Sequence, residues 1–277
     1  MNRKYAILLL IVTGIIWSSG GLFIKLIPWS PISIAGIRSG LSALVIYLYR
    51  RLDPIYLGKY VWAGAISYLV MVICFVFANK ITTSGNVILI QYAAPIYVAL
   101  FSFSFLGEKA NIADWVSILI IFVGLSSFFY EDLSYFQLWG NILSILSGIG
   151  FAGLTLCMRK EKKANPVDCV LMGNILTFLV CIPFYKNGVT SDIKPWVSII
   201  FLGVIQLGLS YIFFSIAIKY VKALDAIIYP VIEPLVNPIL TFLFLGELMS
   251  NTAVFGGALV IIGVVGRGLY QNLYSNQ

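Results

Sequence analysis

Residues 233–247 read EPLVNPILTFLFLGE, and residues 94–108 read APIYVALFSFSFLGE. A shift of 139 residues aligns the two stretches, so that Pro95 meets Pro234 and both stretches end in Leu-Gly-Glu. The same shift pairs residues well outside these stretches: Gly64 with Gly203, Ala78 with Ala217 and Gly124 with Gly263. Because one offset persists over most of the chain, the sequence predicts two copies of one structural unit.

The composition predicts a membrane protein. Of the 277 residues, 60% are hydrophobic and 10% are charged, and the mean hydropathy is +0.98. Soluble domains are far more polar than this. Ten apolar stretches have the ~18–25 residues with which a helix crosses a ~30 Å hydrocarbon core. They lie near 5–26, 31–50, 58–79, 82–106, 112–130, 136–157, 167–185, 196–219, 222–245 and 252–270.

The repeat divides these stretches into two sets of five, in residues 1–132 and 133–277. Because five is odd, the second copy enters the membrane in the opposite orientation to the first. The expected fold is therefore an all-α integral membrane protein of ten transmembrane helices, arranged as two inverted five-helix repeats. Inverted repeats are a recurrent plan of secondary transporters, in which the substrate binds at mid-membrane between the repeats.

Basic residues predict the orientation in the cell membrane. With ten spans both termini lie on one side, and that side collects thirteen of the Lys and Arg residues: Arg3, Lys4, Arg50, Arg51, Lys59, Lys109, Arg159, Lys160, Lys162, Lys163, Lys219, Lys222 and Arg267. The other side holds Lys25, Lys80, Lys186 and Lys194. This bias predicts that both termini are cytoplasmic. The charge faces anionic lipid and implies no nucleic-acid partner.

These features resemble a known family. The two five-helix copies, the SPISIAGIR stretch (30–38), the paired segments that end in Leu-Gly-Glu and the closing GGALVIIGVVG (256–266) are similar to EamA-type members of the drug/metabolite transporter superfamily. The resemblance covers essentially the whole chain. It implies a ten-helix carrier of a small organic metabolite that works by alternating access, often as an exporter, and it implies no particular substrate.

The ninth span carries prolines and polar side chains that do not suit lipid. Pro230, Pro234 and Pro238 are four residues apart and share a face, and each removes a backbone donor, which frees the carbonyls of Ala226, Pro230 and Pro234. A second stripe with the same spacing comprises Asp225, Tyr229, Glu233, Asn237 and Thr241. Free carbonyls need partners within a membrane, so we expect both stripes to face the protein interior.

Glu233 lies near the middle of this span, where a charge costs about 2.5–3.5 kcal/mol. Two interpretations stand. The glutamate is a neutral, hydrogen-bonded group that holds helices together, or it binds a substrate ammonium and carries a coupling proton. Burial favours the protonated form of a carboxyl group, which suits a protonation cycle.

Arg38 is the other charged residue inside a span, about 10 Å from the start of its helix if the helix begins at Pro31. It could attract an anionic substrate group, pair with Glu233, or extend its side chain towards the membrane surface. It lies between Gly36 and Gly40, whose spacing lets another helix approach closely. The resemblance also includes this arginine in the second span, which implies importance without a specific role.

Several aromatic and polar residues fall where the repeats are expected to meet. The candidate substrate-binding residues are Trp17, Gln91, Tyr92, Tyr97, Tyr211, Tyr229, Glu233 and Asn237. An aromatic pocket with one carboxylate suits an ammonium group. For each aromatic residue, ordinary packing is the alternative. Pro95 and Pro234 are candidate hinges, and Glu233 and Arg38 are candidate coupling or gating residues.

The leading hypothesis is a secondary transporter for a small polar metabolite, with an amino acid or amine favoured, either proton-coupled or facilitative. The alternative substrate is a quaternary ammonium or nucleoside-like compound taken up by the cell. A lipid-modifying membrane enzyme is less favoured, because the chain has no histidine and no nucleophile with a nearby base. We expect no cofactor and no metal. A monomer is expected, and a homodimer through the glycine-rich 256–266 segment stays open.

Overall fold

The computed structural model describes residues 1–51, 54–126, 135–185, 189, 192–246 and 251–274. In the first half, the helices are α1 (Arg3–Trp17), α2 (Gly20–Leu26), α3 (Pro31–Tyr49), α4 (Lys59–Ile81), α5 (Ser84–Gln91), α6 (Ala94–Leu106) and α7 (Ile112–Ser126). The second half contains α8 (Tyr135–Lys160), α9 (Val167–Cys181), η2 (Ile182–Phe184), α10 (Ile193–Phe201), η3 (Leu202–Leu209), α11 (Ser210–Ala217), α12 (Ala223–Ile228), η4 (Tyr229–Val231), α13 (Ile232–Leu245) and α14 (Asn251–Tyr274).

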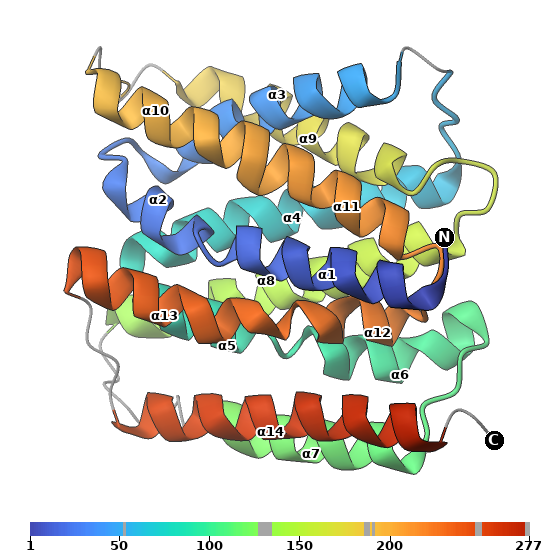
Figure 1. Cartoon of the computed structure of the whole chain (residues 1–277). Coiled ribbons are helices and arrows are strands. Elements are labelled where there is room, and N and C mark those ends of the chain that lie inside the picture. Colours follow the sequence, from blue (N-terminus) through green and yellow to red (C-terminus); the bar gives the residue numbers. More distant parts are fainter. Residues whose placement is uncertain (52–53, 127–134, 186–188, 190–191, 247–250, 275–277) are drawn as a thin grey trace.

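The helices confirm an all-helical membrane protein. Eight segments are long and apolar enough to cross a membrane, and the described apolar parts of the other two, Ile112–Gly124 and Val254–Arg267, are shorter. The ten segments lie roughly side by side and alternate in direction, and both termini lie at the same end of the bundle (Figure 1). We call this the terminal end. The predicted spans agree with the helices to within a few residues, although 127–130 lie outside the described residues.

The two halves pack with the pattern of a two-fold axis. In the first half α1 contacts α11 of the second half, and the equivalent pair α8 and α4 is also in contact. The helices in equivalent positions contact one another too: α3 with α9, α5 with α13 and α7 with α14. Since α1 runs away from the terminal end and α8 runs towards it, the halves are inverted copies (Figure 1).

The fourth helix is broken at equivalent places in both halves. In the first half the break at Tyr92 and Ala93 separates α5 from α6, and in the second half the 3₁₀ turn η4 separates α12 from α13. Pro95 and Pro234 lie in the first turns of α6 and α13, where a proline costs no helical hydrogen bond. The proposed hinge prolines therefore start the second helical piece and do not interrupt a continuous helix.

The Leu-Gly-Glu endings of the repeat have a simple structural reason. Gly107 and Gly246 have positive φ angles of 76° and 67° at the ends of α6 and α13. In each case the glycine N–H donates to the carbonyl of the residue four positions earlier, which closes the helix. Residues other than glycine rarely adopt this left-handed backbone conformation. Glu247, the partner of Glu108 in the repeat, lies outside the described residues.

Gly150 of α8 packs against the backbone of α4, and this contact generates a prediction for stability. A Cβ atom at this position would lie 2.7 Å from the Ser67 carbonyl oxygen and 2.8 Å from the Met71 nitrogen. The backbone of α4 cannot yield as a side chain does, so Gly150→Ala should cost about 1–3 kcal/mol. We expect the apparent melting temperature in detergent to fall by several degrees.

Gly257→Ala in α14 is the matched control, because its nearest neighbour would be a leucine methyl group at 3.6 Å. That variant should be as stable as the parent protein or slightly more stable, since alanine favours a helix. Equal melting temperatures for the two variants would show that α4 and α8 are not tightly packed here.

Candidate functional site

Breaks in helical structure gather halfway along the bundle. The first span is interrupted between α1 and α2 at Ser18 and Ser19, the fourth spans are broken in both halves, and η3 is π-helical. Such irregular backbone is tolerated at membrane depth only where it is enclosed by protein or lines a cavity. π-Helical turns also occur frequently at functional sites. The middle of the bundle is therefore the place to look for a site.

A cavity of about 40 Å³ lies there between the two halves. Its walls are formed by Trp17, Arg38, Met71, Val72, Phe75, Gln91, Phe151, Gln206, Leu207, Tyr211 and Glu233. These residues come from both repeats, as expected for a site on the pseudo-two-fold axis. The cavity has room for a few water molecules at most, so a larger ligand requires the helices to move apart.

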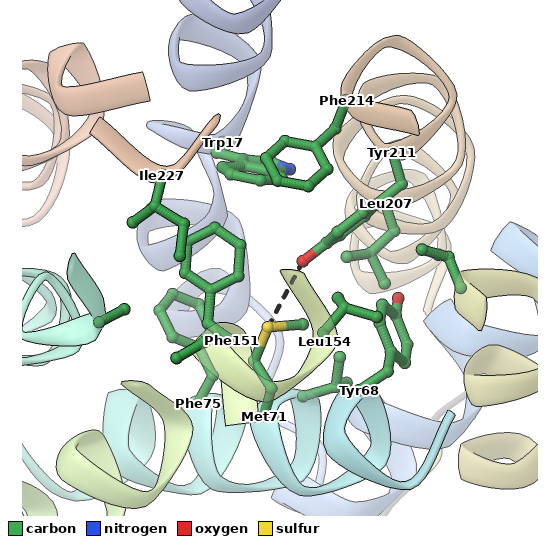
Figure 2. Close-up of a cluster of buried hydrophobic side chains, with 14 of the residues drawn as sticks. Trp17, Tyr68, Met71, Phe75, Phe151, Leu154, Leu207, Tyr211, Phe214 and Ile227 are labelled. Carbon is green, nitrogen blue, oxygen red and sulfur yellow. Dashed lines mark hydrogen bonds between the residues drawn. The ribbon is translucent and has the colours of Figure 1, made fainter. Parts of the chain in front are cut away.

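Four aromatic side chains, Trp17, Phe75, Phe151 and Tyr211, form part of the cavity wall. Figure 2 shows Trp17, Phe151 and Tyr211 pointing towards one another, and the ring of Trp17 lies 5.6 Å from Phe151 and 5.0 Å from Tyr211, centroid to centroid. The polar atoms of these rings are bonded: the Trp17 Nε1 donates to Ser210 Oγ at 2.8 Å, and the Tyr211 hydroxyl donates to Met71 Sδ at 3.5 Å. The rings therefore stand in fixed positions around the cavity.

Glu233 supplies the carboxyl group of the cavity and is only 5% exposed. The Tyr92 hydroxyl lies 2.6 Å from the Pro230 carbonyl oxygen and 3.3 Å from Glu233 Oε2. Because the contact with the carbonyl is the shorter one, the hydroxyl donates its single proton to the Pro230 carbonyl, which lies at the break between α12 and α13. A protonated Glu233 could then donate to the Tyr92 oxygen. This tyrosine thus stabilises both the broken backbone and the buried carboxyl group.

Arg38 supplies the positive charge of the cavity and is only 1% exposed. Its Nε and Nη1 atoms are buried and have no hydrogen-bond partner. Two sequence-based alternatives are therefore wrong in this conformation. The side chain does not extend to the membrane surface, and it forms no hydrogen bond or ion pair with Glu233, although both residues line the same cavity.

The structure brings only part of the predicted site to the cavity. Trp17, Gln91, Tyr211, Glu233 and Arg38 line it, and Tyr92 contacts it through Glu233. Sequence reasoning missed Met71, Phe75 and Phe151, because nothing distinguishes them from other apolar residues in helices. Gln206, which lies in the π-helical turn, gave a weak signal in the sequence, because it is a polar side chain within an apolar span.

Asn237, Tyr97 and Tyr229 were predicted to line the pocket and do not. The amide of Asn237 donates to the Ser18 carbonyl at 2.6 Å, and so gives this carbonyl a partner at the break between α1 and α2. Tyr97 lies on α6, half-buried against the core. Tyr229 is half-buried in the 3₁₀ turn, and its hydroxyl has no hydrogen-bond partner. The break at η4 separates Tyr229 from Glu233, whereas equal spacing assumed a continuous helix.

Ion pairs connect the two halves at the terminal end. Arg50 Nε lies 2.7 Å from Asp168 Oδ1, and Arg159 Nε lies 3.0 Å from Glu108 Oε1. Arg3 lies 3.5 Å from Asp225, and Arg267 pairs with Asp114, so both of these contacts also cross between the halves. Within the second half, Arg267 also lies 3.2 Å from Asp225. We call these contacts the terminal ion pairs.

Comparisons with known proteins agree with a chain built of two repeated halves. The sequence model of the EamA-like transporter family matches residues 4–130 and again residues 138–267. An uncharacterised transporter of Archaeoglobus fulgidus is 24% identical over 95% of this chain and 96% of its own length. The pseudopaline exporter CntI of Pseudomonas aeruginosa is 23% identical over 84% of each chain.

A solved crystal structure of another protein shares the fold, with a TM-score of 0.73 at 18% identity. The match covers 99% of this chain and 100% of the other chain. At this identity the likeness concerns the fold alone.

The Tyr92 hydroxyl generates a prediction for the broken helix. Tyr92→Phe removes the hydroxyl that donates to the buried Pro230 carbonyl, which should destabilise the protein by about 0.5–1.5 kcal/mol, since the carbonyl keeps its contact with the Ile232 N–H. Tyr229→Phe is the matched control, because the hydroxyl that it removes is unbonded. Thermal unfolding in detergent should show a lower midpoint for Tyr92→Phe only. If both variants unfold at the same temperature, the hydroxyl does not support the break.

Proposed function

Because the chain belongs to the EamA-like transporter family, we propose that it is a secondary transporter of a small polar metabolite, an amino acid or an amine, which works by alternating access. It is a multi-pass membrane transporter and not an enzyme. The cavity between the inverted halves is the proposed binding site. A carrier of this kind exposes such a site to each side of the membrane in turn.

The observation that carries this proposal is the buried carboxyl group of Glu233 within an aromatic cavity. A carboxylate at membrane depth is costly unless a proton or a cation neutralises it. A substrate ammonium would supply the cation, and the faces of Trp17 and Tyr211 would add cation–π attraction. A quaternary ammonium compound is the second candidate, since it also suits an aromatic cavity with one negative charge.

Proton coupling follows from the same carboxyl group. If a proton and the substrate ammonium compete for Glu233, binding of one releases the other, and the two fluxes are exchanged. The Tyr92 oxygen at 3.3 Å supports this idea, because it can accept a hydrogen bond from the protonated acid. We propose export as the direction, which the relative described as an exporter supports.

We further propose that the terminal end faces the cytoplasm, since most of the basic residues gather there. The terminal ion pairs would then close the cytoplasmic side. We propose a monomer as the working unit. The glycine-rich face of α14 is engaged within the chain, because a Cβ at Gly124 of α7 would lie 2.7 Å from the Gly256 carbonyl oxygen.

Transport by purified protein in proteoliposomes tests the role of Glu233. We expect uptake of at least one labelled amino acid or amine to be driven by a pH gradient. Glu233→Gln cannot take up or release a proton, so gradient-driven accumulation should fall at least tenfold while the protein stays folded. The folded state would be checked by its melting temperature and by its elution as one species.

Glu161→Gln is the matched control, since that glutamate lies at the terminal end and accepts a hydrogen bond from the Lys163 backbone. It should transport like the parent protein. Full accumulation by Glu233→Gln would refute proton coupling through this residue, and no transport of any amino acid or amine would refute the proposed substrate class.

The accessibility of the cavity tests the terminal ion pairs. In a variant without the four native cysteines, Leu207→Cys places a thiol on the cavity wall. A membrane-impermeant maleimide added from the terminal side should react slowly if the terminal ion pairs close this end. Adding Glu108→Gln and Asp168→Asn removes two of the connections between the halves, so the labelling rate should rise several-fold.

Lys162→Gln in the same background is the control, because it removes a charge at the terminal end and none of the connections. It should label as slowly as the parent variant. Equal rates for all three proteins would mean that the ion pairs do not close this end.

A further inference from the structure

We propose that the substrate carries a carboxylate as well as an ammonium, and that Arg38 binds the carboxylate while Glu233 binds the ammonium. This inference rests on the proposed function and narrows it to zwitterions such as α-amino acids. It starts from an observation that transport of an amine does not explain, namely a buried guanidinium group that lacks hydrogen-bond partners at Nε and Nη1.

The surroundings of Arg38 do not neutralise it. The hydroxyls of Tyr68 and Tyr211 are its electrostatic neighbours, but Tyr68 donates to Asn174 Oδ1 at 2.9 Å and Tyr211 donates to Met71. Among the described residues, no carboxylate lies within ion-pair distance of this guanidinium. A buried charge without a partner is strongly unfavourable, so the site is incomplete in the absence of an anion.

The chemistry of arginine suits a carboxylate. A guanidinium presents its N–H donors in a planar fork that can bind both oxygens of a carboxylate at once. Arg38 also lines the same cavity as Glu233, so one small molecule can reach both side chains. The aromatic rings of the same cavity provide an apolar wall for the rest of the molecule.

The two charges come from different halves of the protein. Arg38 lies on α3 of the first repeat, and Glu233 lies on α13 of the second. A zwitterion would therefore connect the halves through its two ends. An amine without a carboxylate would engage only the second half and would leave Arg38 unpaired, so the site should discriminate strongly between the two.

Binding to the purified protein tests this inference. The probes are three matched panels: the twenty proteinogenic amino acids, their amides and their decarboxylated amines. Ligand-induced thermal stabilisation gives a dissociation constant for each. We expect at least one amino acid to bind, and to bind at least tenfold more tightly than its own amide and amine. In Arg38→Gln this preference should disappear, because the amino acid loses its carboxylate contact and falls to the level of its amine.

Without ligand, Arg38→Gln should be at least as stable as the parent protein, since it removes an unpaired buried charge; a purely structural arginine would give the opposite result. Should Arg38→Gln not fold, Arg38→Lys keeps the charge without the planar fork and should reduce the preference by several-fold. An unchanged preference in the variant that folds overturns the inference.

If amines bind and amino acids do not, the inference fails and the proposed function stands. If no compound of any panel binds, both fail.

Discussion

The structure depends on one constraint: every backbone polar group that leaves a helix within the membrane must find a partner inside the protein. The break in the fourth span of the second half is satisfied by the Tyr92 hydroxyl on the Pro230 carbonyl. The break in the first span is satisfied by Asn237 on the Ser18 carbonyl. In both cases the partner lies in the other half of the chain, so neither half can place its broken helices alone.

The same constraint explains where the charges lie. Glu233 and Arg38 line the cavity in the middle of the bundle, and the ionic contacts between the halves lie at the terminal end. Irregular backbone and the two charges of the cavity thus occupy the same region, because both need an enclosed polar environment. The centre of the bundle therefore holds these polar groups, and the lipid-facing surface stays apolar.

The sequence predicts the features that leave a one-dimensional signal. Hydropathy located the spans, the constant offset located the repeat, and single charges in apolar segments located Arg38 and Glu233. The sequence was a weaker guide to which residues line the cavity, because that depends on the three-dimensional arrangement of the helices. Tyr229 was grouped with Glu233 because four-residue spacing implies one helical face, but the 3₁₀ turn changes the direction of the helix between them. Phe75 and Phe151 gave no signal, since only the fold distinguishes an apolar residue on the cavity from one in the core.

The pseudo-two-fold axis holds for the backbone and not for the charges. The shift of 139 residues places Ala94 opposite Glu233 and Asn86 opposite Asp225, so neither acidic residue has a counterpart. In a fully symmetric carrier, exchanging the conformations of the two halves would produce a state that opens to the other side of the membrane. The two states would have the same free energy. Here Asp225 of the terminal ion pairs and Glu233 of the cavity have no acidic equivalents in the first half. If the protein works by the proposed alternating access, the two conformations of the empty protein should therefore differ in free energy, and substrate binding must offset that difference in each transport cycle.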